Sequence, residues 1–137
     1  MRHWLLKSEP SAYSWEQLVK DGRTNWNGVR NFQAANNLKA MSVGDRAFFY
    51  HSNEGLAIVG IAEIVREAYP DPSDKSGKFV MVDVAPVEKV PQPVTLAQIK
   101  TEPKLANFGL VRQGRLSVVP VSDEEWRLIT KMAGVKA

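Results

Sequence analysis

The stretch Leu56-Ala57-Ile58-Val59-Gly60-Ile61-Ala62-Glu63-Ile64-Val65-Arg66 is the longest apolar run in the chain. Its apolar and β-branched residues fall on both faces of an extended chain, which is typical of a central strand buried on both sides. Gly60, in the middle of the run, predicts a bulge or the sharp bend that a small barrel needs at a corner. We therefore expect a central strand in a strongly bent sheet.

A turn-rich segment, residues 69–77, follows this run, and residues 79–87 then alternate as a second strand. Val80, Val82 and Val84 share one face of that strand. The two strands are expected to pair antiparallel, joined by a solvated loop. The pattern predicts that three prolines end the second strand: Pro86, Pro91 and Pro93. We also expect three acidic residues in or near the loop to be solvated: Asp71, Asp74 and Asp83.

Four helix starts are predicted from side chains that accept hydrogen bonds at a helix N-terminus. The predicted N-caps are Ser14, Asn31, Thr95 and Ser122. Three of them have Gln or Glu three residues later, which completes a capping-box pattern. The first helix should end at Gly22 and the second should run to Met41. The apolar residues expected to face inward in these two helices are Trp15, Leu18, Val19, Phe32, Ala35, Leu38 and Met41.

Three further strands are expected at residues 3–7, 46–51 and 116–119. The last helix should bury Trp126 and Ile129 and end at Gly134. Short strands with helices between and after them favour an α+β domain around a small, partly closed mixed β-barrel. The length of 137 residues, with 44% hydrophobic content, fits a single domain over residues 1–137.

Composition excludes several kinds of chemistry. The chain has no Cys and only two His, so disulfides, a thiolate zinc site and a histidine metal cluster are not expected. We expect no cofactor and no metal. No run of 18 apolar residues and no signal-peptide core occur. The expectation is a soluble, cytoplasmic monomer without membrane contact, or a nuclear one if the source is eukaryotic.

The net charge of +3 is mild, and its distribution is more informative. Residues 1–53 hold seven Lys and Arg against four Asp and Glu, whereas the remainder is balanced at eleven of each. The basic excess therefore lies in one part of the chain. A surplus of this size also serves solubility alone, so charge by itself does not establish nucleic-acid binding.

Two stretches in that basic part combine an aromatic ring with polar groups. They are Trp26-Asn27-Gly28-Val29-Arg30-Asn31 and Tyr50-His51-Ser52-Asn53. An aromatic face stacks on a planar heterocycle, and amide, hydroxyl or imidazole groups hydrogen-bond its edge. These stretches point to nucleobase recognition.

Each of these residues also has a structural interpretation. The turn-like context of Trp26 favours a pocket over the core, whereas Trp4 lies in an apolar strand typical of core. Tyr50 should end its strand at a pocket rim. His51 fits a base edge or a backbone contact equally well. Three polar residues could instead serve local structure: Asn31 as a helix cap, and Ser52 and Asn53 as turn formers.

Four segments occur in an order that resembles the EVE domain family. They are Lys7-Ser8-Glu9-Pro10, the two stretches above, and Arg115-Leu116-Ser117-Val118. The resemblance spans nearly the whole chain. It implies a PUA-like barrel, related to the YTH readers of methylated adenine, that binds a modified base in DNA or RNA through an aromatic pocket. We expect base flipping, with modified cytosine as the favoured ligand.

From this resemblance and the residue types we expect two groups of contacts. The expected nucleobase contacts are Trp4, Ser8, Glu9, Trp26, Val29, Asn31, Tyr50, His51, Ser52, Asn53, Leu116 and Ser117. Trp26 and Tyr50 are expected to hold the ring between them, and Val29 and Leu116 to accept a methyl or hydroxymethyl substituent. The expected phosphate contacts are Lys7, Arg30 and Arg115.

Catalysis is not expected, because the chain lacks a G-x-S-x-G elbow, a Walker loop, an H-E-x-x-H motif and a zinc deaminase signature. Two alternatives stay open. One is a nucleic-acid or nucleotide-processing enzyme, for which Ser8, Glu9 and His51 are the imaginable residues. The other is a protein-interaction module with the same fold, in which the aromatic stretches only pack and turn.

Overall fold

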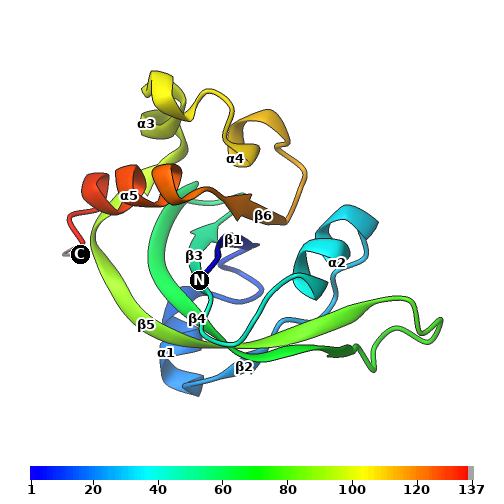
Figure 1. Cartoon of the computed structure of the whole chain (residues 1–137). Helices are drawn as coiled ribbons and strands as arrows, with labels where there is room; N and C mark the ends of the chain where they lie inside the picture. Colours follow the sequence, from blue (N-terminus) through cyan, green and yellow to red (C-terminus); the bar gives the residue numbers. More distant parts are fainter. Residues whose placement is uncertain (136–137) are drawn as a thin grey trace.

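The computed structural model describes residues 1–135 (Figure 1). In this part of the chain, one mixed sheet has the strand order β2-β5-β4-β3-β1-β6. Only β1 and β3 run parallel; the other neighbours are antiparallel. The strands are β1 (His3–Ser8), β2 (Thr24–Asn25), β3 (Arg46–His51), β4 (Ala57–Pro70), β5 (Val80–Thr95) and β6 (Val118–Val121).

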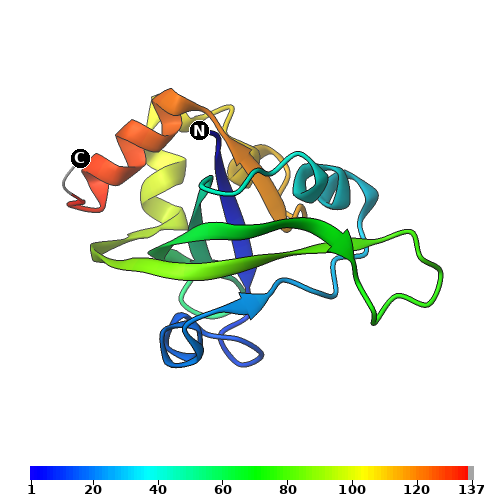
Figure 2. The same cartoon turned by 60° about the horizontal axis from the view of Figure 1, so that its bottom comes forward.

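The sheet bends sharply, because β1 crosses the long β4–β5 ribbon at a steep angle (Figure 2). The terminal strands β2 and β6 do not pair with each other, so the barrel is only partly closed. This arrangement confirms the α+β, partly closed mixed barrel with flanking short helices. As predicted, β4 lies at the centre, between β3 and β5.

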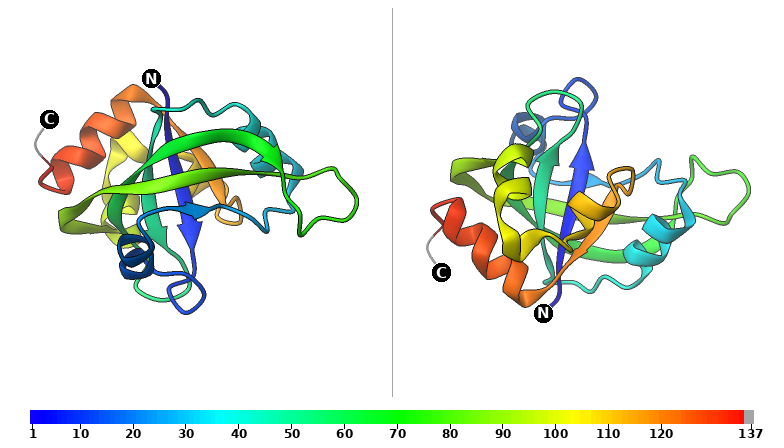
Figure 3. Two further views of the ribbon diagram at one scale, coloured as in Figure 1. Left: turned by 90° about the horizontal axis from the view of Figure 1, so that it is seen from below. Right: turned by 90° about the horizontal axis from the view of Figure 1, so that it is seen from above.

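Helices cover the sheet from several sides. α3, α4 and α5 gather on one side, α1 lies on the opposite side, and α2 lies near the tip of the β4–β5 hairpin (Figures 1 and 3). Their bounds are α1 (Trp15–Asp21), α2 (Phe32–Lys39), α3 (Leu96–Thr101), α4 (Gly109–Arg112) and α5 (Asp123–Met132), with a 3-10 turn at Pro103–Leu105.

The predicted helix starts are confirmed. The side chains of Ser14, Asn31, Thr95 and Ser122 each accept a hydrogen bond from a backbone N–H in the first turn. Thr95 and Ser122 form complete capping boxes. Gly22 ends α1 with a φ of 75°, a left-handed conformation that glycine adopts without strain.

Of the bulge or bend predicted at Gly60, the pairing shows an irregularity of the bulge type. The pairing of β4 shifts register next to this residue on both sides, between Ile58 and Gly60 towards β5 and between Phe49 and Tyr50 towards β3. A Cβ at Gly60 would lie 2.5 Å from the Trp15 ring. Glycine is therefore required here by close packing of α1 against the sheet.

Both faces of β3 are buried. Phe48 stacks on Trp126 of α5 at 4.0 Å between ring centroids. Phe49, on the other face, meets the rings of Trp15 and Trp26 edge-on at 5.5 and 5.6 Å. The hydrophobic core thus lies on both sides of the sheet centre, and Trp26 is attached to it from one side.

Several predictions about the fold were wrong. β5 continues through Pro86, Pro91 and Pro93 to Thr95. Among the described residues, β2 pairs with only Val84 and Asp83 of β5, so most of that edge lies outside the ladder, where a proline removes no ladder hydrogen bond. β6 begins two residues later than expected, and β2 was not predicted.

The predicted burial of four further residues was also wrong. Val19 is 52% exposed and Phe32 63% exposed, because the sheet reaches only part of the apolar face of each helix. Asp71 and Asp83, interpreted as solvated, are buried. Asp83 accepts hydrogen bonds from the Tyr69 hydroxyl and from Arg23, which explains how its carboxylate is accommodated.

Candidate functional site

A pocket of about 480 Å³ lies between the end of β1, the loop that follows it, and the segment around β2. This volume falls within the roughly 300–1,000 Å³ that is typical of small-molecule sites. We call it the Trp26 pocket. Its lining residues are Lys7, Ser8, Glu9, Ala12, Tyr13, Thr24, Asn25, Trp26, Asn27, Gly28, Val29, Arg30 and Ser117.

Trp26 forms the inner wall of this pocket. Its backbone N–H donates to the Val82 carbonyl at 2.7 Å, which extends the β2–β5 pairing by one residue. The side chain is 8% exposed and packs against Phe49. The Tyr13 ring meets it at 6.4 Å between centroids, with the ring planes 89° apart. Trp26 therefore belongs to the core and to the pocket at once.

The loop from Trp26 to Arg30 is held in place by Asp71, which comes from the β4–β5 connection. The Asp71 carboxylate accepts hydrogen bonds from the Gly28 N–H at 2.8 Å and from the Arg30 guanidinium at 3.1 Å. Ser73 donates to it through both its N–H and its hydroxyl. Gly28 has a φ of 80°, which explains the glycine at this turn.

The electrostatics of this anchor follow from its hydrogen bonds. The Asp71 side chain is fully buried, and burial alone would raise its pKa. The donors from Ser73, Gly28 and Arg30 outweigh that effect and lower the pKa well below the ordinary value of an aspartate. Asp71 therefore stays ionised and fixes the shape of the pocket loop.

The opposite wall comes from the end of β1. Lys7 donates from Nζ to the Gly114 carbonyl at 2.7 Å, and burial lowers the pKa of its ammonium group. Ser8 donates its hydroxyl proton to the Tyr13 carbonyl, which fixes the turn before α1. Glu9 is exposed, and within residues 1–135 its carboxylate receives no hydrogen bond. An acceptor is thus available at the mouth of the pocket.

Tyr50 and Trp4, both expected to contact the base, do not line the pocket. Tyr50 is 2% exposed and lies on the opposite face of β3 from Phe49, the residue that contacts Trp26. Trp4 is 3% exposed and donates from Nε1 to Asp45 at 3.1 Å. Strand alternation therefore directs Tyr50 away from Trp26, and the expected pair of facing rings does not form.

His51, Ser52 and Asn53 also lie outside the pocket lining. His51 accepts at Nε2 from the Trp15 N–H at 3.1 Å, and burial lowers the pKa of the imidazole. The Ser52 N–H donates to the Ser8 carbonyl at 2.9 Å. Asn53 is exposed with a φ of 66°, a turn conformation that Asn tolerates. These residues hold the β3–β4 turn and the start of α1.

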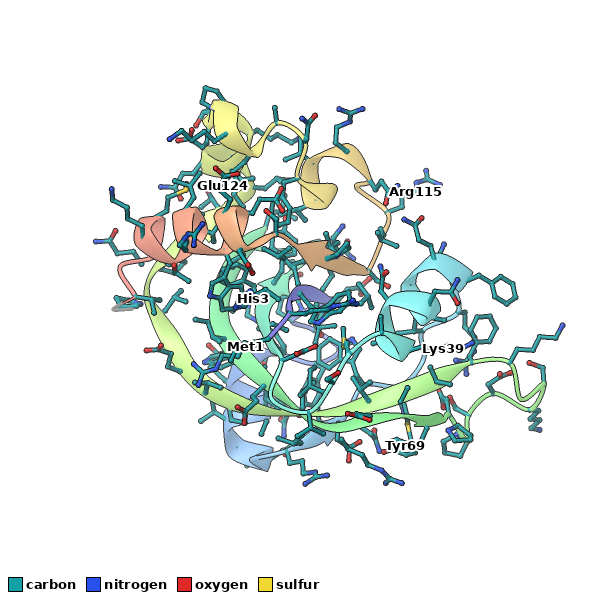
Figure 4. All side chains as sticks on the ribbon, viewed as in Figure 1. Met1, His3, Lys39, Tyr69, Arg115 and Glu124 are labelled. Carbon is teal, nitrogen blue, oxygen red and sulfur yellow. The ribbon has the colours of Figure 1, made fainter. Side chains whose placement is uncertain are left out.

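Three more expected contacts lie outside the lining. Asn31 caps α2, accepting from the Ala34 N–H at 2.9 Å. Leu116 is 5% exposed and belongs to the core cluster. Arg115 is exposed and points outward from the connection between α4 and β6, next to the Gly114 carbonyl that binds Lys7 (Figure 4). Of the three, Leu116 is buried, whereas Arg115 and Asn31 are exposed and can reach a ligand outside the pocket.

The sequence did not single out several lining residues. Tyr13 is the most important of them, because it supplies the second aromatic ring. Its position between the Pro10 turn and the Ser14 cap gave a local signal of exposure, but nothing local linked it to Trp26. Asn27 and Gly28 lay inside a quoted stretch without a role. The others are Ala12, Thr24 and Asn25.

The pocket therefore offers two perpendicular aromatic rings, an acidic acceptor, a basic group on either side, and amide and hydroxyl groups from Asn25, Asn27 and Ser117. Such a set suits a planar, polar, edge-bonding ligand. Among the described residues, His, Asp and Glu do not gather in a group able to hold a metal ion. None of the helices in residues 1–135 is long and apolar enough to span a membrane.

Comparison with known proteins places the chain among characterised folds. Residues 2–132 match the EVE domain. The chain is 37% identical to human thymocyte nuclear protein 1 over 164 aligned residues, which cover 95% of this chain and 73% of that protein.

Two solved structures are also similar. A protein from Rhodopseudomonas palustris, solved by NMR, has 57% identity and a TM-score of 0.93, covering 98% of this chain and 94% of that one. The crystal structure of the human THYN1 protein in complex with DNA containing 5-methylcytosine has 35% identity and a TM-score of 0.92, covering 100% of both chains.

Proposed function

The chain belongs to the EVE domain family, and we propose that it is a non-catalytic reader that binds a modified nucleobase, in the first place a modified cytosine, in DNA or RNA. The base enters the Trp26 pocket after it has left its stack. The whole chain, residues 1–137, acts in this proposal as one EVE domain. The compartment is the one that holds the nucleic acid, the cytoplasm of a bacterium or the nucleus of a eukaryote.

One observation carries the proposal. A pocket of base-binding size and chemistry, with the Trp26 and Tyr13 rings beside the Glu9 carboxylate, occurs in a chain that matches over its whole length a protein crystallised with 5-methylcytosine DNA. Most of the pocket residues come from two segments that distinguish the sequence, Lys7–Pro10 and Trp26–Asn31.

The two rings bind the base as a corner and not as a sandwich. Since their planes are perpendicular, a base that stacks on one ring meets the other ring at its edge. Trp26 exposes only 8% of its surface, whereas Tyr13 is partly exposed. We therefore assign the stacking face to Tyr13 and the inner end of the pocket to Trp26 and Val29, where an apolar substituent on the base would lie.

Edge recognition falls to the groups at the mouth of the pocket. A carboxylate accepts well from the exocyclic amine of cytosine, and the exposed Glu9 carboxylate at the pocket supports this role. Ser8 and Ser117 lie beside it. Lys7, Arg30 and, outside the pocket, Arg115 supply positive charge for the phosphate backbone.

Magnitudes favour single-stranded or weakly paired targets. Extruding a paired base costs a few kcal/mol, and stacking on an aromatic ring returns roughly 1–3 kcal/mol. Stacking in the Trp26 pocket thus about offsets extrusion. The net affinity must come from edge hydrogen bonds and phosphate contacts, so it should be higher when extrusion is not needed.

The proposal is tested by binding of short DNA and RNA oligonucleotides that differ only in one central base. Cytosine, 5-methylcytosine, 5-hydroxymethylcytosine, adenine and N6-methyladenine would be compared by fluorescence anisotropy at fixed salt. We expect the tightest binding for a modified cytosine, stronger on a single strand than on a duplex. Equal affinity for every oligonucleotide would contradict the proposal.

Two substitutions connect that preference to the pocket. Tyr13→Ala removes the stacking face and should weaken binding of the preferred oligonucleotide about 5-fold or more, while Tyr13→Phe keeps the ring and most of the affinity. Both variants should fold, because Tyr13 is partly exposed. Val43→Ala, at an exposed apolar residue in the α2–β3 turn, serves as the control.

Mass spectrometry of the oligonucleotide after incubation would detect turnover, which the proposal excludes.

A further inference from the structure

A second aromatic surface lies next to the Trp26 pocket. Phe32, the first residue of α2, is 63% exposed, and its ring packs on the ring of Phe79 at 4.9 Å between centroids with the planes 31° apart. The Arg30 guanidinium lies 5.4 Å from the centroid of Phe79. We call Arg30, Phe32 and Phe79 the Phe32 platform. It lies where α2 approaches the tip of the β4–β5 hairpin (Figures 1 and 2).

Resting on the proposed function above, we propose that the Phe32 platform stacks a nucleobase that neighbours the flipped base on the same strand. The platform thereby forms a second nucleotide subsite. Its ligand class is an unpaired base of any identity, because every base has a face on which an aromatic ring can stack.

The first argument is exposure. Phe32 was expected to pack inward, yet most of its surface faces solvent although a large apolar side chain gains about 1.5–3 kcal/mol on burial. Phe79 beneath it is 9% exposed, so Phe32 rests on a fixed base and presents its outer face. Scattered exposed apolar residues are ordinary. An exposed ring supported by a second ring and flanked by a guanidinium is the arrangement that single-strand binding surfaces use.

The second argument is distance. Arg30 lines the Trp26 pocket and also lies over Phe79, so one side chain borders both sites. Arg30 and Phe32 are two residues apart, which an extended chain spans in at most about 7 Å. The platform therefore lies within reach of the nucleotide next to a base that occupies the pocket.

The third argument is rigidity and charge. Arg30 is fixed by hydrogen bonds to Asp71 at 3.1 Å and to the Ser73 hydroxyl at 2.9 Å, so the platform is preorganised. Lys75 and Lys78, in the loop before Phe79, are exposed. Asp74 lies in the same loop. Its carboxylate already accepts hydrogen bonds from the Ser76 hydroxyl and from the backbone N–H groups of Lys78 and Phe79. The surroundings of the rings thus favour a polyanion such as a nucleic-acid strand over a basic protein partner.

The test compares a ligand that has neighbours with one that has none. Wild type, Phe32→Ala, Phe32→Leu and Phe32→Trp would be titrated with the preferred modified nucleoside alone and with a single strand of five nucleotides carrying it centrally. We expect nucleoside affinity to be unchanged in all four proteins. Strand affinity should fall at least about 5-fold in the Ala and Leu variants and be retained in the Trp variant.

An abasic residue identifies the neighbour. The abasic residue is placed directly 5′ of the modified base in one strand and directly 3′ in another. At only one of these positions should it weaken wild-type binding, and there by as much as Phe32→Ala does. At that position it should not weaken binding by the Phe32→Ala protein any further. Val43→Ala, at another apolar residue that is 58% exposed, is the matched control and should leave the affinity for the nucleoside and for the strand unchanged.

The outcomes separate the two proposals. Preference for the modified base with no effect of Phe32→Ala on strand affinity overturns the second subsite alone. Retention of strand affinity in Phe32→Leu together with loss in Phe32→Ala would indicate apolar docking of a different kind and also overturns it. Absence of any modified-base preference in wild type overturns the proposed function, and the subsite with it.

Discussion

Trp26–Asn31 and Tyr50–Asn53 have the same kind of composition, an aromatic ring followed by amide, hydroxyl or imidazole groups, but they do different things. The first surrounds the Trp26 pocket through Trp26, Val29 and Arg30. The second ends a strand inside the core and closes a turn. Residue types alone therefore do not define a base-binding site; the face on which the ring lies decides it.

The physical cause of the difference is the partner of each segment. The first segment follows a two-residue edge strand, and Asp71 holds its loop open from a distance of 43 residues along the chain. The second begins at the end of β3, which has a strand on either side and buried side chains on both faces. A loop held at the edge of a sheet can form a wall, whereas a central strand cannot.

The largest expected effect comes from breaking the anchor of the first segment. Asp71→Ala removes hydrogen bonds to Gly28, Arg30 and Ser73. It should lower the free energy of unfolding by about 3 kcal/mol and reduce affinity for the modified base at least about tenfold. Urea unfolding and fluorescence anisotropy measure the two effects. Asp123→Asn, at an exposed helix start, is the control; an effect of equal size there would remove the special role of Asp71.

The next largest effect is expected from a substitution that alters base preference without altering the free energy of unfolding. Glu9→Gln replaces the acceptor at the pocket mouth by an amide of the same shape, and should lower the preference for cytosine-type bases by about 2 kcal/mol, roughly 30-fold. Unfolding should be unchanged because Glu9 is exposed. Glu54→Gln, an exposed acid in the β3–β4 turn, is the matched control. Unchanged base preference in Glu9→Gln would place the acceptor elsewhere.

The second segment should show the reverse pattern. His51→Ala removes the acceptor for the Trp15 N–H, and should lower the free energy of unfolding by about 1 kcal/mol. Base preference should stay as in wild type. If His51→Ala instead abolished base preference in a stable protein, the comparison of the two segments would fail and the imidazole would belong to the site.

The smallest effect is a pH dependence that differs between the segments. Burial lowers the folded-state pKa of His51 and of His3 below 6.5, so the unfolded chain binds protons more readily. Their contribution to stability is complete above pH 6.5 and is lost as the pH falls through the folded-state values. Asp71, with its lowered pKa, keeps its contribution until the pH falls below 3.8.

Unfolding measured between pH 7 and pH 5 should therefore show a decline that is smaller in His51→Asn, a variant without a titrating group at this position. The remaining decline belongs to His3. The Asp71 anchor should show no change in this window. A pH dependence identical in wild type and His51→Asn would contradict the assignment to His51.

Local hydrogen bonding explains which parts of the fold were predicted. A cap such as Ser14, Thr95 or Ser122 binds an N–H group three residues later, so both partners are visible in a short window of sequence. The prolines of β5 were misread for the opposite reason. Whether Pro91 ends a strand depends on whether another strand pairs with that edge, and no short window contains this information.

The candidate site divides in the same way. Trp26, Glu9, Lys7 and Arg30 were expected at a site, and they line one pocket. Tyr13 was missed because its only link to Trp26 is the packing of two loops, separated by α1 and β2 along the chain. The position of Tyr50 away from the pocket could not be foreseen, because the aromatic run of β3 has alternation but no sign of which face meets Trp26.

The sequence by itself thus determined the family, the helix starts, the central strand with its irregularity at Gly60, and the Trp26–Arg30 segment that lines the pocket. These depend on residue type and on partners within a few positions. Only the tertiary structure decided that Tyr13 replaces Tyr50 as the second ring, that Asp71 is a buried anchor, and that Phe32 faces solvent. Those outcomes depend on sheet register and curvature, which bring together groups dozens of residues apart.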